Sequence, residues 1–264
     1  MRIASQRMAR ELRNSSHLGR RSGKMGINTM RKQEGFTLIE IAIVLVIIGL
    51  LLGGVLKGQE LINAARVRNI ASQLDGVKIA YLGFQDRYRA YPGDMPSATS
   101  TTQIPGAPVG CVTAPTCANG KIDPNENLLV WSHLSKAGFI SGSYTGTVDT
   151  GVVFQTPTSA DSPSNPFGGF LVLTNDNDFG DTTATPAAVT NIKTGGNIAV
   201  AMVAELDRKV DDGLPGQGSF RIGIAYGGVT PAVGSCLTGT ANGTPGMLYN
   251  AAVDVKSCGG VAIQ

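Results

Sequence analysis

An apolar run of 21 residues, Phe36 to Leu56, constrains this chain more than any other feature. It reads FTLIEIAIVLVIIGLLLGGVL and contains a single charged residue, Glu40. As an α-helix the run would be roughly 31 Å long, about the thickness of the hydrocarbon core of a bilayer. We therefore expect residues 36–56 to form the transmembrane half of an N-terminal helix.

Charges on the two sides of this run predict its orientation. Residues 1–35 hold nine Lys/Arg and two acidic residues, whereas the rest of the chain holds 13 Lys/Arg and 17 Asp/Glu. Because positive flanks stay in the cytoplasm, we expect a cytoplasmic N-terminus and an exported C-terminal bulk. The basic charge is confined to the tail, so we expect no nucleic-acid partner despite the net charge of +3.

A cleaved secretory signal is the alternative, since it is also basic and then apolar. However, the run is longer than a typical signal core, and no small-x-small cleavage site follows it. Residues 57–63 instead continue as an amphipathic helix. The sequence therefore favours a segment that stays attached to the exported part.

Glu40 is unexpected in this setting, because a carboxylate inside an apolar span costs on the order of 3 kcal/mol even on a lenient insertion scale. No basic residue lies within residues 36–56 to pair with it. Two interpretations stay open. Glu40 reaches the interface from a position near the start of the helix, or another chain supplies its partner.

Residues Glu34 to Glu40, EGFTLIE, resemble the cleavage and methylation motif of type IV pilins and type II secretion pseudopilins. The resemblance implies that a prepilin peptidase cleaves after Gly35 and methylates the new N-terminus at Phe36. It further implies that Glu40, the fifth mature residue, neutralises the terminal amine of a neighbouring subunit. Two charges in lipid are tolerable when they are paired, so this would supply the missing partner.

The same resemblance implies a single-pass protein of the bacterial inner membrane that assembles into a filament and is not an enzyme. Its partners would be membrane lipid, copies of itself or related pilins, the prepilin peptidase, and an assembly platform with its ATPase. Two rivals are a minor tip subunit that binds a surface or DNA, and a single-span anchored protein that never polymerises. No GxSxG, GxGxxG or GxxxxGK[ST] motif argues for an enzyme.

The chain departs from the family pattern in two ways. The basic leader, residues 1–35, is longer than the usual one, and a start at Met30 would shorten it to six residues. We expect residues 1–29 to be an over-extended start or a dispensable tail. The proline often found just past the membrane segment is absent, and Lys57 stands there.

Beyond the membrane segment, one apolar stripe recurs in steps of three and four, as on one face of a helix. Its members are Val67, Ile70, Leu74, Val77, Tyr81, Phe84, Tyr88 and Tyr91. Pro92 pushes the preceding residue out of helical space. We expect one helix from about Phe36 to Ala90, whose amphipathic half, residues 57–91, packs on an exported head.

The head, residues 92–264, is predicted to be α+β, with a small antiparallel sheet as in pilins. Residues 92–127 are rich in Pro, Gly and Thr and read as a long loop. The expected helices are Asn127–Ile140 and Asn197–Val210, and the expected strands are Gly151–Gln155, Gly169–Thr174 and Ser219–Tyr226.

Four cysteines lie in the exported part, where disulfides form. Three pairings are possible, and we expect the nearest-neighbour one, Cys111 with Cys117 and Cys236 with Cys258. A zinc site would need closer spacing and usually a histidine. We expect His133 to be on the surface of its helix or half-buried.

Two acidic segments could hold a metal ion. The segment Asn175–Asp181 has oxygen ligands at alternating positions, which makes Asp176, Asp178 and Asp181 candidates for a structural calcium site. Such residues also form ordinary polar turns, which is the preferred interpretation. Asp207, Asp211, Asp212 and Gly213 are typical of a helix end, with a metal or a subunit contact as the alternative.

Overall fold

A computed structural model describes residues 35–106, 110–112, 116–146, 154–183, 185–224, 233–239 and 246–264. The predictions for the leader, including a start at Met30, lie outside these residues. So do most residues of the strand expected at 151–155, of which the described part, Phe154 and Gln155, is irregular.

The first element is one continuous helix, α1 (Leu38–Tyr88), and its bounds lie within two residues of those expected. It ends where Arg89 adopts a positive φ of 53°, three residues before Pro92. The chain divides into two compact units at Leu51/Leu52. In the first unit every residue from Gly35 to Leu51 is exposed.

In the second unit, residues 52–264, α1 buries one face. The buried side chains on this face are Val67, Ile70, Leu74, Val77, Ala80, Tyr81 and Phe84. Tyr88 and Tyr91, at the end of the predicted stripe, are half-buried against the same core. The three-and-four spacing therefore correctly predicted which face of the helix packs.

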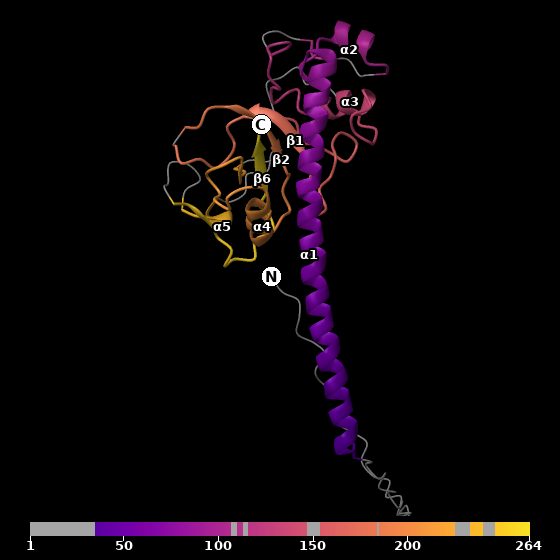
Figure 1. Ribbon diagram of the computed structural model, residues 1–264, viewed down its shortest axis with the longest axis vertical. Helices are drawn as coiled ribbons and strands as arrows, with labels where there is room; N and C mark the ends of the chain where they lie inside the picture. The colour runs from indigo at the N-terminus through magenta and orange to yellow at the C-terminus, as the bar shows by residue number, and fades with distance from the viewer. Residues whose placement is uncertain are drawn as a thin grey trace, which may run out of the picture. The chain divides into compact units, whose positions relative to one another are not determined.

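A four-stranded antiparallel sheet forms the centre of the second unit (Figure 1). Its order is β1 (Val172–Asp176), β2 (Val189–Lys193), β6 (Gly260–Ile263) and β3 (Phe220–Ile222). The chain's last strand thus lies between β2 and β3, with Ala262 opposite both Ile192 and Phe220. A helix followed by an antiparallel sheet confirms the α+β class.

A second, two-stranded sheet pairs β4 (Leu237–Thr238) with β5 (Leu248–Tyr249). Neither of these strands was predicted from the sequence, nor were β2 and β6. The strand predicted at Gly169–Thr174 begins three residues before β1, and the one predicted at Ser219–Tyr226 runs past the end of β3. These strands are two to five residues long, so each lacks a sustained alternation of apolar and polar residues.

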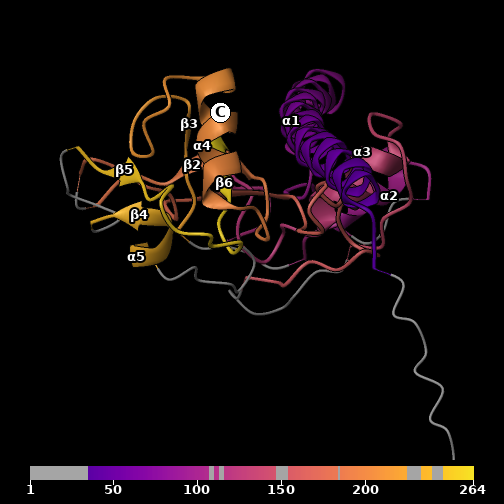
Figure 2. The ribbon, with the colours of Figure 1, turned by 90° about the horizontal axis from the view of Figure 1, so that it is seen from below.

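Four further helices are α2 (Ser97–Gln103), α3 (Leu129–Lys136), α4 (Val200–Val210) and α5 (Val233–Cys236). The two expected helices are thus present but shorter, and α2 lies inside the segment expected to be a loop. The left-handed φ of Gly138 (81°) follows the end of α3. Figures 1 and 2 show α2 and α3 beside the C-terminal part of α1, and α4 near the sheet.

One apolar core joins these elements. Phe84 of α1 is fully buried, with its ring centroid 4.6 Å from that of Tyr88 and 6.1 Å from that of Phe139. Trp131 on α3 and Phe220 on β3 are also fully buried. Each such side chain contributes about 1.5–3 kcal/mol when removed from water, so α1 is held to the rest of this unit by its buried face.

Candidate functional site

The start of α1 is capped by its own side chains. Thr37 donates both its backbone N–H and its hydroxyl to Oε2 of Glu40, at 2.9 Å each. In return the N–H of Glu40 donates to Oγ1 of Thr37 at 3.3 Å. This reciprocal arrangement is a capping box, which satisfies backbone donors that the first turn of a helix leaves unpaired.

The capping box gives Glu40 a role within its own chain that was not predicted from the sequence. The signal was present as Thr37-x-x-Glu40, with a threonine followed three residues later by a glutamate. Both Thr37 contacts use Oε2, so the other carboxylate oxygen takes no part in the cap.

Gly35 and Phe36 precede the helix and are exposed, with Phe36 83% accessible. The peptide bond between them therefore lies in exposed, non-helical chain. From Leu38 to Leu56 the helix is exposed and carries Glu40 as its single charge. In the part of the chain that the structure describes, α1 is the one helix long and apolar enough to cross a membrane.

These features define a class: an α+β protein whose N-terminal apolar helix fits membrane anchoring and starts at a short non-helical segment. Comparison with known proteins identifies that segment. Residues 30–56 match the family model described as the prokaryotic N-terminal methylation motif, the signature of type IV pilins and pseudopilins. No curated protein and no solved structure matches the chain. The motif indicates a pilin-like structural protein of the kind that prepilin peptidase processes.

The four cysteines form two disulfides, Cys111–Cys117 and Cys236–Cys258, with sulfur atoms 2.05 and 1.99 Å apart. The second joins the short helix α5 to the segment just before β6. Cys258 also exchanges two backbone hydrogen bonds with Ile198, at 3.0 and 3.1 Å. Cys258 therefore connects the start of β6 to the residues just before α4.

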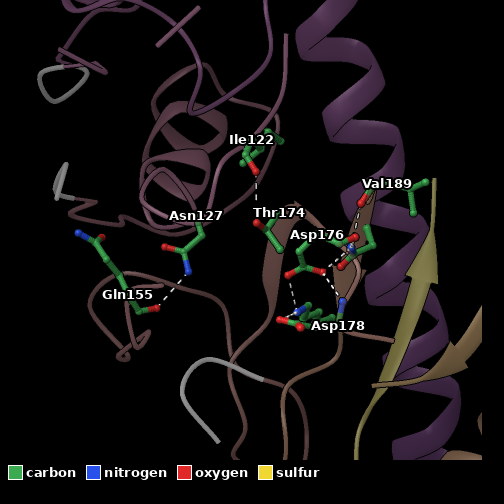
Figure 3. A network of polar contacts seen from close by, with 9 residues as sticks. Ile122, Asn127, Gln155, Thr174, Asp176, Asp178 and Val189 are labelled. Carbon is green, nitrogen blue, oxygen red and sulfur yellow. Dashed lines mark hydrogen bonds and ion pairs between the residues drawn. The ribbon is translucent and has the colours of Figure 1, made fainter. Parts of the chain in front are cut away.

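The three calcium candidates of the first acidic segment contact cationic side chains. Nζ of Lys193 on β2 lies 2.6 Å from Oδ2 of Asp176 and 3.5 Å from Oδ2 of Asp178. Figure 3 shows Asp176 and Asp178 in this network of polar contacts. Asp181 is separately paired with Arg221. The calcium site at these residues stays a prediction, and its carboxylates already have protein cations as partners.

The second acidic segment ends α4 as a polar turn. Asp207 is buried and accepts hydrogen bonds from the hydroxyl of Tyr249 at 2.7 Å and the N–H of Gly213 at 3.1 Å. Asp212 accepts the N–H of Leu214 at 2.8 Å. Burial raises the pKa of Asp207 to about 6. These contacts are what the helix-end interpretation expects.

His133 is fully buried, so the expectation of a surface or half-buried side chain is wrong. Its Nδ1 accepts the backbone N–H of Gly93 at 3.0 Å, and its ring stacks on Phe84 with centroids 6.2 Å apart. Burial lowers the pKa of His133 to about 4, so the ring is neutral at pH 7. The residue joins the turn after α1 to α3.

A third acidic group was not predicted from the sequence. Asp94 and Glu126 are 3% and 0% exposed, and their carboxylate oxygens lie within 4.8 Å of each other and of Sγ of Cys111. Burial raises the pKa of both, that of Glu126 to about 8. The two residues are 32 positions apart, so no local pattern places them together. The sequence did contain one signal for this group: Asn119, Gly120 and Glu126 have the spacing of positions 5, 6 and 12 of a twelve-residue calcium loop.

Proposed function

We propose that this chain is a structural subunit of a helical filament, either a type IV pilus-like filament or a type II secretion pseudopilus. The observation that supports this most directly is Glu40, the single charge of an exposed apolar helix segment that matches the methylation motif. A carboxylate in an apolar span is costly, and a positive charge supplied by a neighbouring subunit offsets that cost.

In this proposal the prepilin peptidase removes the basic leader after Gly35 and methylates the amine of Phe36. The N-terminus is cytoplasmic, and the second unit is outside the inner membrane. Residues 36–56 are covered first by lipid and then, after extraction by the assembly platform and its ATPase, by the same segment of neighbouring subunits.

Glu40 would act twice. One carboxylate oxygen caps the helix through Thr37, and the other is left for the methylated amine of an adjacent subunit. Pairing the two charges offsets the cost of placing each of them in an apolar surrounding. Subunits would then add in one register, because a displaced neighbour would leave both charges unpaired.

Substitutions of Glu40 separate capping from pairing. Glu40→Gln keeps an oxygen that can accept from Thr37, since glutamine serves in capping boxes, but it has no charge. Glu40→Ala loses both functions. We expect both variants to insert in the membrane and both to fail in filament assembly or secretion. Glu60→Gln, a charge loss further along α1 at an exposed ion pair with Lys57, is the control and should assemble.

Each result has a definite meaning. Assembly by Glu40→Gln at the wild-type level would reject pairing and leave capping as the role of Glu40. Assembly by Glu40→Ala would favour an anchored protein that never polymerises. Mass spectrometry of the mature N-terminus tests processing directly, and any terminus other than N-methylated Phe36 would reject the proposal. A scarce protein confined to filament tips would instead favour the minor subunit.

A further inference from the structure

The buried carboxylates of Asp94 and Glu126 lie on two chain segments that meet beside the first disulfide. Asp94 belongs to the turn after α1, and Glu126 ends the loop that leads into α3. Backbone hydrogen bonds between Met95 and Cys111 (3.1 Å) and between Ser97 and Cys111 (3.2 Å) align the first segment. The disulfide then holds Cys117, and with it the loop, against that segment.

The loop is folded around these carboxylates. Oδ1 of Asp94 accepts the N–H of Asn119 at 3.1 Å, and Oδ2 accepts that of Gly120 at 2.7 Å. Oε2 of Glu126 accepts the N–H of Asp123 at 3.1 Å. Gly120 has a φ of +80°, the left-handed conformation that favours glycine and allows the sharp turn.

One buried oxygen in this group has no donor. Oε1 of Glu126 makes no hydrogen bond, although the residue is 0% exposed. None of the ion pairs among the described residues involves Asp94, Asp123 or Glu126. Buried carboxylates without a cationic partner are costly, because burial removes the water that solvates their charge. Either a proton or a bound cation between the two carboxyl groups removes this cost.

Sequence spacing in the loop indicates which cation. In a twelve-residue calcium loop, positions 5, 9 and 12 supply oxygen ligands, position 6 is glycine, and position 12 is a glutamate that uses both oxygens. Asn119, Gly120, Asp123 and Glu126 have this spacing when Gly120 is position 6. Position 3 falls on Cys117, which is in the disulfide, so the early part of the loop supplies no carboxylate. Asp94 supplies a carboxylate from the neighbouring segment instead.

The distances agree with this ion. Two oxygens that bind one Ca²⁺ at about 2.3–2.6 Å can be at most about 5 Å apart. The carboxylate oxygens of Asp94 and Glu126 meet this limit at 4.8 Å or less. We propose that Asp94 and Glu126, with oxygens of the 119–123 loop, form a calcium site that fastens the turn after α1 to the start of α3. This site is independent of the filament proposal, which rests on the other end of α1.

Trp131 provides a probe for the test. It is the chain's one tryptophan, fully buried on α3 five residues after Glu126. The full-length chain, purified in detergent and stripped with a chelator, is titrated with CaCl₂ while Trp131 emission and the thermal unfolding midpoint are recorded. We expect a saturable change in emission and a higher midpoint, at micromolar to millimolar Ca²⁺. Mg²⁺ should act more weakly, because it demands octahedral geometry and retains its water.

Variants locate the response. Glu126→Gln and Asp94→Asn each remove one charge without a large change in size, and each should weaken Ca²⁺ binding by about tenfold or more. Asp178→Asn and Asp212→Asn, in the other two acidic segments, should leave the titration unchanged. A titration that survives Glu126→Gln but is lost in either control variant would move the site and overturn the proposal.

Calcium binding can also be tested on the wild-type protein alone, so the test holds even if a variant does not fold. Elemental analysis after dialysis at saturating Ca²⁺ should give one bound calcium ion per chain above a detergent and buffer blank. No saturable response at millimolar Ca²⁺, or an equal response to Mg²⁺ at the same concentration, would overturn the assignment. If Asp94 and Glu126 merely share a proton, the titration should show no saturable response to Ca²⁺.

Discussion

Nζ of Lys193 lies 2.6 Å from Oδ2 of Asp176, and the side chains of the two residues are 1% and 11% exposed. Lys193 lies opposite Val172 and Asp176 opposite Val189, so the pair links the two ends of the antiparallel β1–β2 ladder. A buried ion pair gains Coulomb energy but loses hydration, so it gives little net stability. Removing one partner of such a pair is strongly destabilising, because the remaining charge stays buried without its partner.

We therefore expect Lys193→Met to lower the free energy of unfolding by about 3–5 kcal/mol, because Asp176 would be left without its cation. Denaturant titration of the purified chain measures this. Lys209→Met, which breaks the half-exposed pair with Glu205, is the matched control and should cost about 0.5 kcal/mol or less. Equal losses in the two variants would contradict the argument.

His133 should make stability depend on pH. Its pKa is lowered to about 4 by burial, whereas in the unfolded chain it is about 6.5. Between these values the unfolded state binds the additional proton, so stability falls as the pH falls from about 6.5 to 4. The full loss is about 3 kcal/mol, at roughly 1.4 kcal/mol per pKa unit.

His133→Gln isolates this contribution, because its amide oxygen can accept the Gly93 N–H but does not titrate. Unfolding free energies of both proteins are measured from pH 7 to pH 4, where carboxylates titrate in both and cancel in the difference. The advantage of the wild type over the variant should shrink on acidification. Parallel pH curves would show that the ring is not buried as the structure has it.

The two disulfides should differ in their effects on stability. Cross-linking restricts the unfolded chain more when the closed loop is longer, so removal of the 22-residue bridge Cys236–Cys258 should cost about 3 kcal/mol. Removal of the six-residue bridge Cys111–Cys117 should cost about 2 kcal/mol in the absence of calcium. Paired Cys→Ala variants, unfolded in chelator, give both values, and a reversed order would reject loop length as the deciding factor.

Two glycines should respond to alanine in opposite directions. A Cβ on Gly260 of β6 would clash with Cζ of buried Phe220, so Gly260→Ala should destabilise the sheet by about 1–3 kcal/mol. A Cβ on Gly76 of α1 would meet nothing within 4 Å. Gly76→Ala should stabilise the helix by about 0.5–1 kcal/mol. Thermal unfolding of each variant checks both signs, and a stabilised Gly260→Ala protein would show that Phe220 readily moves away.

Sequence patterns correctly predicted the helices α1, α3 and α4, whose positions depend on residues close together in the chain. The bounds of α1 and the buried face of its second half follow from apolar spacing and from Pro92. Both helices expected in the head exist as α3 and α4, with shorter ends. Strands β2 and β6 were missed because each is short and gains its stability from a partner far along the chain, so its own residues carry little of the signal.

The apolar segment, its single glutamate and the processing motif are contiguous, and the sequence by itself determined them together with the helix that carries them. Only the tertiary structure decided that Lys193 meets Asp176, that His133 is buried against Gly93, and that Asp94 faces Glu126. Each of these pairs joins residues on separate elements, and the free energy of each meeting depends on the burial and charge that the folded chain creates there. A residue's neighbours in sequence do not specify that environment.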